Sequence, residues 1–338
     1  MSPRERVLRC LEFNRPDRVP RDLWWLPIAE LEHGKRAFSA FRRRWPADIV
    51  DVDVPNKALM GLRKGDPYLA GEYQDEWGCV FKNIQAGVIG QVKTPRLGDW
   101  SKLDRLRVPV EALSLDVEQI NQFCTNTDKF VLAGCCPRLF ERMQFLRGSE
   151  NLYLDIAEDV SGFRQLLKTL HEFYCQEMGA WAHTQVDALT IMDDWGSQRS
   201  LLISPRKWRM LFKPLYAEYV QIAHGAGKKI FMHSDGHIFE IYEDLIEIGI
   251  DAINSQLFCM NIENIGQRFA GRITFWGEID RQWVLPFGTA TDARAAVKRV
   301  VDNLYRPEGG VIAQFEVGAA AKIKNAHAVF DAWHELTS

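Results

Sequence analysis

The stretch Ser204–Gly236, SPRKWRMLFKPLYAEYVQIAHGAGKKIFMHSDG, contains one helix and the buried strand that follows it. Ser204 is a favoured N-cap residue, and Pro205 suits the first helical position. Apolar residues then recur with helical spacing as far as Ile222, and a glycine-rich turn ends the helix before the apolar run Lys229–His233. This succession of helix and buried strand is the repeating unit of an α/β fold with a parallel sheet.

Eight strand-like runs occur along the chain, and helical periodicity follows most of them. They are continuously apolar rather than alternating, as expected of parallel strands that are buried on both faces. Eight such units fit a closed (β/α)8 TIM barrel better than an open sheet, within a single domain that spans residues 1–338. The runs are Val19–Leu26, Asp48–Val54, Phe130–Cys135, Val186–Met192, Lys229–His233, Asp251–Asn254, Ile273–Trp276 and Gly310–Phe315.

One region departs from this alternation. Residues 56–115 contain the short segments Gly78–Asn83 and Gly87–Val92 and then a segment around Trp100. We interpret this region as an insertion between the second and third strands, consisting of a β-hairpin and a lid or rim element.

The overall composition is that of a globular protein. Of the 338 residues, 46% are hydrophobic and 26% are charged, which provides for a sizeable core. The formal net charge of −3 gives no general attraction to nucleic acid or to an anionic membrane, and no apolar run is long enough to span a membrane. The seven cysteines form no C-x-x-C pair, and the first residues lack the apolar core of a signal peptide, so we expect reduced thiols and a cytoplasmic protein.

Polar residues gather after the predicted strands, where the chemistry of such barrels takes place. His233 and Asp235 end the fifth strand two residues apart, so an extended strand directs both to the same side. Imidazole and carboxylate groups bind divalent metals such as zinc, and Glu278 or Glu316, after the last two strands, could complete the ligand set. In the alternative interpretation, Asp235 accepts hydrogen bonds from backbone amides in a turn, and His233 is an interior histidine.

Asp193 and Asp194 form a second notable pair, at the end of the fourth strand. Neighbouring carboxylates in a desolvated place can raise one pKa, which suits proton transfer, so we count both, with His233, as catalytic candidates. Alternatively, one of them caps the next helix and the other pairs with Arg199 or Arg206.

Other residues near the strand ends are candidates for substrate binding. Arg138 suits bidentate binding of a carboxylate or phosphate, although a salt bridge with Glu141 is an equal alternative. Cys135 and Cys136 are more typical of buried small residues than of nucleophiles, since no histidine lies near them in the sequence. The remaining candidates are Trp195, Gln198, Asn254 and Gln256.

Several motifs are distributed over nearly the whole chain. They include RERV at Arg4–Val7, RPDRVP at Arg15–Pro20, YQDEWG at Tyr73–Gly78, DDWGSQ at Asp193–Gln198, HSDG at His233–Gly236 and WGEID at Trp276–Asp280. Together they resemble the uroporphyrinogen decarboxylase superfamily, and more closely its methyltransferase-like branch, whose members move methyl groups between methylated substrates, corrinoid proteins and thiols. The resemblance implies the barrel independently of the strand count.

Two departures limit what this resemblance implies. The decarboxylases have an arginine-rich segment near the N-terminus that helps to bind the porphyrinogen carboxylates, whereas this chain has Asp22–Pro27, DLWWLP. The thiol-activating methyltransferases hold zinc through His-x-Cys and a distant second cysteine. Here His233 matches, but Asp235 replaces the first cysteine and Phe315 the second. A metal bound by such harder ligands is better suited to activating a substrate oxygen than to delivering a zinc thiolate.

The resemblance therefore implies a corrinoid-dependent methyltransferase that acts on a small methylated donor, with zinc as the expected metal and with the corrinoid supplied by a partner protein. A cofactor-free decarboxylase of a smaller acid is the first alternative, with Asp194 stabilising a protonated intermediate and Arg138 holding a carboxylate. A barrel that binds a ligand without catalysis is the second. The sequence leaves the oligomeric state open, and a homodimer is one arrangement that it allows.

Overall fold

The apolar runs form one curled parallel sheet in the computed structural model, which describes residues 1–337. Seven strands follow one another in the order β11-β10-β9-β8-β7-β6-β2, and all their pairings are parallel. Each strand overlaps one of the predicted runs. The strands are β2 (Ile49–Asp51), β6 (Phe130–Leu132), β7 (Ala188–Met192), β8 (Lys229–Ser234), β9 (Ala252–Ser255), β10 (Thr274–Trp276) and β11 (Val311–Ile312).

The first predicted run lies between the two edges of this sheet. It contains β1 (Trp24–Trp25), which pairs in parallel with β12 (Glu316–Val317), the continuation of β11. On the other side, the backbone N–H of Asp48 donates a 2.7 Å hydrogen bond to the carbonyl of Arg21, next to the start of β2. The curled sheet with these connections is the arrangement of a TIM-like barrel.

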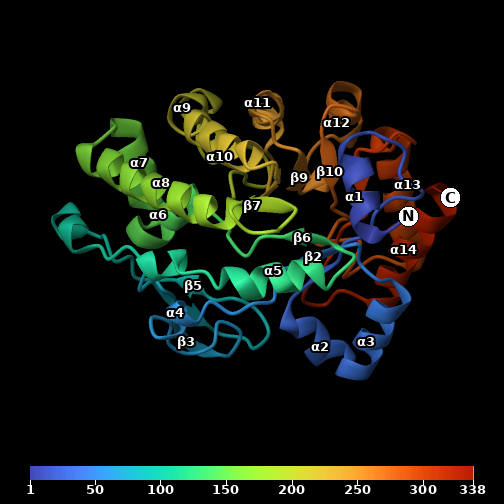
Figure 1. Ribbon diagram of the computed structural model, residues 1–338, viewed down its shortest axis with the longest axis horizontal. Coiled ribbons are helices and arrows are strands. Elements are labelled where there is room, and N and C mark those ends of the chain that lie inside the picture. Colours follow the sequence, from blue (N-terminus) through green and yellow to red (C-terminus); the bar gives the residue numbers. More distant parts are fainter. Residues whose placement is uncertain (338) are drawn as a thin grey trace.

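Helices surround the sheet, as the ribbon in Figure 1 shows, and both chain ends lie on the same side of the molecule. Most of these helices follow a strand and pack an apolar face against it. They are α2 (Pro27–His33), α3 (Lys35–Arg44), α5 (Val117–Thr125), α6 (Leu139–Arg147), α7 (Ser149–Glu158), α8 (Ser161–Ala182), α9 (Pro205–Leu211), α10 (Lys213–Gly225), α11 (Tyr242–Ile248), α12 (Ile262–Phe269), α13 (Ala290–Leu304) and α14 (Ile323–Thr337), with short 3-10 turns at Phe239–Ile241 and Leu257–Cys259.

The N-terminal helix α1 (Pro3–Leu11) closes one end of the barrel. The N–H of Arg4 donates to the carbonyl of Asp128, which precedes β6, and the carbonyl of Cys10 accepts from Gly310, which precedes β11. The apolar side of α1 shares a buried cluster with the inward side chains of the strands, Phe231 among them. Because α1 covers the amino ends of the strands, the open end of the barrel is the one where the strands finish.

The region at residues 56–115 does not follow the alternation of strands and helices, as the sequence predicts. It contains α4 (Lys57–Met60), a three-stranded antiparallel sheet of β3 (Gly71–Gln74), β4 (Val80–Asn83) and β5 (Gln91–Val92), and 3-10 turns at Trp100–Arg105 and Val110–Leu113. In Figure 1 this sheet and α4 lie below the barrel. The region is attached through Trp77, whose ring contacts that of Phe173 in α8 at 5.1 Å. Its role as a lid stays a prediction.

The long helix expected between Ser204 and Gly225 consists of two pieces. Pro214 cannot donate the backbone hydrogen bond of a helix interior. The helix accordingly breaks at Phe212, and Pro214 lies in the first turn of the second piece, α10. Within residues 1–337, no helix has the length and apolar character needed to cross a membrane, and all seven cysteines are free thiols.

Candidate functional site

Three side chains converge where β7 and β8 end, at the open end of the barrel. Asp194 follows β7, His233 lies in β8, and Asp235 follows it; the parallel register that pairs Met192 with His233 brings the two strand ends together. Nε2 of His233 lies 3.6 Å from Oδ1 of Asp194 and 3.5 Å from Oδ1 of Asp235. The three atoms face one another, and we call these three residues the strand-end cluster.

Two glycines allow the loops after β7 and β8 to approach so closely. Gly236 has a φ of +81°, and a Cβ at this position would lie 2.1 Å from the carbonyl oxygen of Gly196. The backbone N–H of Asp235 donates a 2.9 Å hydrogen bond to Oδ1 of Asp194, which joins the two loops. The DDWGSQ and HSDG motifs therefore form one unit that positions both carboxylates.

Asn254, in β9, determines which nitrogen of His233 carries a proton. Its Nδ2 donates to the backbone carbonyl of Trp276, an obligatory acceptor, so its Oδ1 must be the atom that faces Nδ1 of His233 at 2.7 Å. Nδ1 is therefore the donor in this bond. In a neutral imidazole, Nε2 is then left with a lone pair, directed at the two aspartates.

A cluster of three acceptor atoms needs a positive charge among them. Oδ1 of Asp235 is buried and has no hydrogen-bond partner within residues 1–337. Burial also raises the pKa of Asp194, an effect that His233 opposes. Either a proton on Nε2 or a bound cation satisfies the three atoms, and one imidazole nitrogen with two carboxylate oxygens is a suitable donor set for a divalent metal such as zinc.

Arg281, which follows β10, lies among Asp235 of the strand-end cluster and two further acidic side chains. It contacts Oδ2 of Asp235, its Nη1 lies 3.4 Å from Oε2 of Glu316, and its Nε lies 3.5 Å from Oε1 of Glu278. Asp235 thus has one oxygen on the arginine and the other directed at His233. The guanidinium fixes the orientation of this side chain.

The structure brings Asp194 to His233 and places both glutamates of the predicted ligand set on Arg281. Glu278 is buried, and burial raises its pKa to about 8 although Arg281 opposes the shift. Its Oε2 has no hydrogen-bond partner within residues 1–337. A role of Glu278 or Glu316 as a metal ligand stays a prediction.

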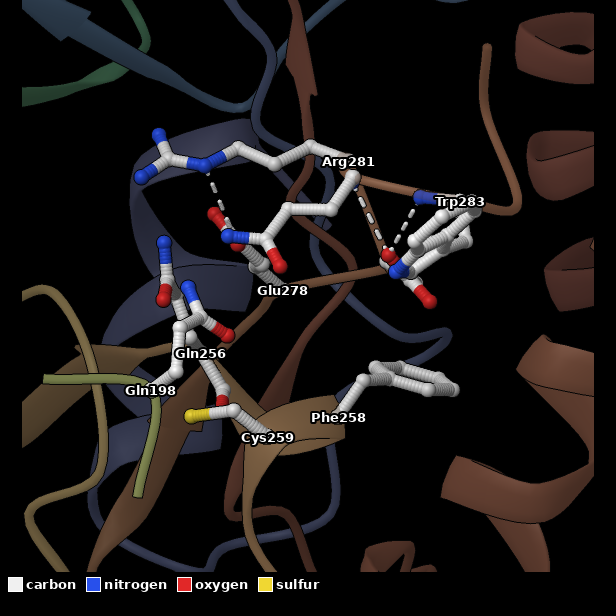
Figure 2. A pocket seen from close by; sticks show the side chains of 9 residues that line it. Gln198, Gln256, Phe258, Cys259, Glu278, Arg281 and Trp283 are labelled. Atoms are coloured by element: carbon white, nitrogen blue, oxygen red, sulfur yellow. Dashed lines mark hydrogen bonds and ion pairs between the residues drawn. The ribbon is translucent and has the colours of Figure 1, made fainter. Parts of the chain in front are cut away.

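A cavity of about 120 Å³ opens beside Arg281. Figure 2 shows Gln198, Gln256 and Glu278 around it, with the side chain of Arg281 extending across the view. Phe258, Cys259 and Trp283 supply its apolar wall. The cavity combines a cation, a buried carboxyl group and two amides with an apolar surface, which suits a small molecule with one polar end.

Hydrogen bonds from the start of α6 and from Tyr216 hold the carboxyl group of Asp193 in place. Its two carboxylate oxygens accept 2.7 Å hydrogen bonds from the backbone N–H groups of Phe140 and Glu141, at the start of α6, and the hydroxyl of Tyr216 donates to it as well. Burial raises its pKa to about 7, and these hydrogen bonds oppose the shift. Asp193 therefore caps α6, a helix that precedes β7, whereas the alternative interpretation of the sequence expected an aspartate to cap the next helix.

Trp195 and Arg138 lie away from the strand-end cluster. Trp195 is completely buried, with its ring stacked on Phe140 at a centroid distance of 4.2 Å, so it offers no surface to a substrate. Arg138 pairs with Glu141 at 2.6 Å and lines a different cavity, of about 230 Å³, together with Cys136 and Glu177. Burial raises the pKa of Glu177 to about 7.

Sequence reasoning missed Arg281 as part of this site. The residue comes three positions after Glu278, directly behind the WGEID motif, so its place after a strand end was a usable signal. Asn254 orients His233, while Gln256 lines the cavity and accepts a 3.1 Å hydrogen bond from the N–H of Gly236. Substrate binding by these two residues stays a prediction.

The curled parallel sheet with polar clusters at its carboxyl edge is the architecture of the TIM-like α/β barrels. The sequence model of the uroporphyrinogen decarboxylase (URO-D) family matches residues 80–336, and the chain belongs to that family. Among solved structures, a methyltransferase from Methanosarcina mazei is similar over 99% of both chains, with a TM-score of 0.67 and 15% sequence identity, which shows a shared fold. A search of curated protein sequences gives no match.

Proposed function

We propose that this member of the URO-D family is a methyltransferase that takes a methyl group from a small oxygen- or nitrogen-linked donor and passes it to a corrinoid protein. The observation that carries the proposal is the convergence of Nε2 of His233 with two carboxylate oxygens, which creates a place for a proton or a divalent cation at the open end of the barrel. The methyltransferase from Methanosarcina mazei, which has the same fold, supports the reaction class.

The heteroatom that loses the methyl group needs stabilisation of the negative charge that develops on it. A zinc ion held by Asp194, His233 and Asp235 would supply Lewis acidity at this position. Asn254 keeps Nε2 of His233 directed at the cluster, and Arg281 holds Asp235 in place. The neighbouring cavity, with Gln256 on its wall, would orient the donor.

The first test measures zinc content and methyl transfer on the same protein samples. Free cobalamin in its reduced form serves as the methyl acceptor, and a panel of methoxy compounds and methylamines serves as donors. His233→Gln and Asp235→Asn are expected to reduce both the zinc affinity of the strand-end cluster and the methylcobalamin formed by at least about tenfold. Glu263→Gln, a substitution in an exposed ion pair on α12, is the control and should change neither.

Zinc and transfer that both stay at the wild-type level in His233→Gln would refute this assignment. Transfer that persists in Asp235→Asn after its zinc is lost would leave the proton on Nε2 of His233 as the activating group. No transfer by the wild-type protein with any donor of the panel would contradict the proposed reaction.

A cofactor-free decarboxylase is the second candidate, favoured by the environment of Arg281. A carboxylate substrate in the cavity could pair with this guanidinium, and the buried carboxyl group of Glu278 is placed to return a proton after carbon dioxide leaves. Release of carbon dioxide from a small acid, unchanged in His233→Gln and lost in Glu278→Gln, would favour this reaction over methyl transfer.

A further inference from the structure

A second group of potential metal ligands lies in the helical layer outside the barrel. His171 and Cys175 are four residues apart in α8, so they lie on the same face of the helix, one turn from each other. Glu218 approaches them from α10, and one donor atom from each residue lies within 4.8 Å of the other two. None of these residues belongs to the strand-end cluster or lines the cavity beside Arg281.

The distances match tetrahedral zinc coordination. With a Zn–S bond of 2.3 Å and a Zn–N bond of 2.0–2.1 Å, the sulfur and nitrogen ligands of one zinc ion are about 3.6 Å apart. Sγ of Cys175 lies 3.6 Å from Nε2 of His171. Oε2 of Glu218 lies 3.0 Å from the same nitrogen. The oxygen and nitrogen ligands of one zinc ion are about 3.4 Å apart, so this half-exposed side chain would need to move only slightly.

The surroundings of His171 orient it as a ligand. Its Nδ1 lies 3.1 Å from the hydroxyl oxygen of Tyr219, and its Nε2 lies 3.0 Å from Oε2 of Glu218. Sγ of Cys175 lies 3.6 Å from Nε2 and 3.8 Å from Nδ1, so this thiol must turn toward Nε2 to share an ion with it. A metal-bound histidine almost always donates its other ring N–H to an acceptor, which fixes the tautomer and the ring plane. Both His171 and Tyr219 are buried, so this orientation is supported by packing as well.

We propose that His171, Cys175 and Glu218 form a binding site for a transition-metal ion, with zinc as the preferred occupant. One thiolate, one imidazole and one carboxylate leave a fourth coordination position for water. The ion would connect α8 to α10, which already pack against each other, and it would therefore stabilise the helical layer independently of the chemistry at the open end of the barrel.

Cobalt(II) is the probe for the test, because only a site with a thiolate ligand gives sulfur-to-cobalt charge-transfer absorption. The full-length protein is first treated with a chelator and then titrated with Co²⁺. The strand-end cluster has no sulfur ligand, so a charge-transfer band reports only the site formed by His171, Cys175 and Glu218. We expect this band in the wild-type protein and in His233→Gln, and its loss in Cys175→Ser.

Two further variants separate ligation from a general effect on the helix. Tyr219→Phe removes the acceptor of Nδ1 and should weaken cobalt binding about 10- to 100-fold without abolishing the band. Glu172→Gln changes an exposed carboxylate next to His171, in an ion pair with Lys168, and should bind cobalt like the wild type. Circular dichroism confirms that each variant is folded.

Equilibrium dialysis with zinc gives the second measurement. Cys175→Ser should bind one zinc ion fewer than its parent, in the wild-type and in the His233→Gln background alike. A wild-type protein without the charge-transfer band would refute the proposal. So would a band that persists in Cys175→Ser, because it would arise from another thiol.

Discussion

Oδ1 of Asn254 lies 2.7 Å from Nδ1 of His233, and the backbone carbonyl of Trp276 prevents the amide from turning the other way. The proton is thereby assigned to Nδ1, and Nε2 is directed at Asp194 and Asp235. The side-chain amide of Asn254, in the neighbouring strand, thus directs Nε2 of His233 at the two aspartates. There Nε2 can bind a metal ion or, when protonated, act as an acid.

Replacing Asn254 by alanine should weaken zinc binding at the strand-end cluster about 10- to 100-fold, because His233 loses the acceptor that orients it. The carbonyl of Trp276 and the side chain of Gln314 also lose a donor, so the free energy of unfolding should fall by about 1–3 kcal/mol. Zinc dialysis and urea denaturation check the two effects. Unchanged zinc affinity in a folded Asn254→Ala protein would show that the amide does not orient the histidine.

Arg281 pairs with Asp235 and Glu316 and also contacts the buried carboxyl group of Glu278, so its removal should be costly. Arg281→Met should lower the free energy of unfolding by about 3–5 kcal/mol, because buried charges lose their partner. The matched control is Arg272→Met, which breaks an exposed pair with Glu243 and should change stability far less. Equal losses in the two variants would contradict the central place of Arg281.

The two neighbouring aspartates should respond differently to the same substitution. Asp193→Asn should reduce stability by about 1–3 kcal/mol, because an amide cannot accept from all three donors that the carboxylate serves. Asp194→Asn keeps an oxygen for the N–H of Asp235 but loses its charge, so it should reduce zinc binding with little change in stability. Thermal unfolding and zinc dialysis on both variants provide the check, and a reversed pattern would exchange the two roles.

The strands could be predicted well from the sequence because they are continuous apolar runs in a buried parallel sheet. The run Lys229–His233 ends one residue before β8 does, and the run Asp251–Asn254 begins and ends one residue before β9. The eighth run was less accurate, since it covers β11 but ends before β12, which pairs with a different neighbour. Local hydrophobicity does not specify where a strand changes partners.

The site was predicted in part, because sequence order shows which residues follow strands but not which side chains meet. His233 and Asp235 do converge, as their spacing along one strand predicts. Asp193 and Asp194 are equivalent in the sequence, yet the alternation of side chains sends one to the start of α6 and the other to His233. Arg281 meets Asp235 from another strand end, a long-range contact that no local pattern indicates.

Glu278 should make stability depend on pH near neutrality. Its pKa is about 8 in the folded protein against 4.5 as the ordinary value, so between these values the folded state holds a proton that the unfolded state has released. Its contribution to stability is fully present below pH 4.5 and is lost as the pH rises to about 8, with a slope of at most about 1.4 kcal/mol per pH unit.

Glu278→Gln has no such proton, so urea denaturation at pH 5, 6, 7 and 8 should show its stability rising relative to wild type along this series. Glu263→Gln is the control: ion pairing with Arg299 lowers the pKa of Glu263 to about 2, which confines its effect to acidic pH. Parallel pH profiles of wild type and Glu278→Gln would mean that Glu278 is ionised in the folded protein and that Arg281 outweighs the effect of burial.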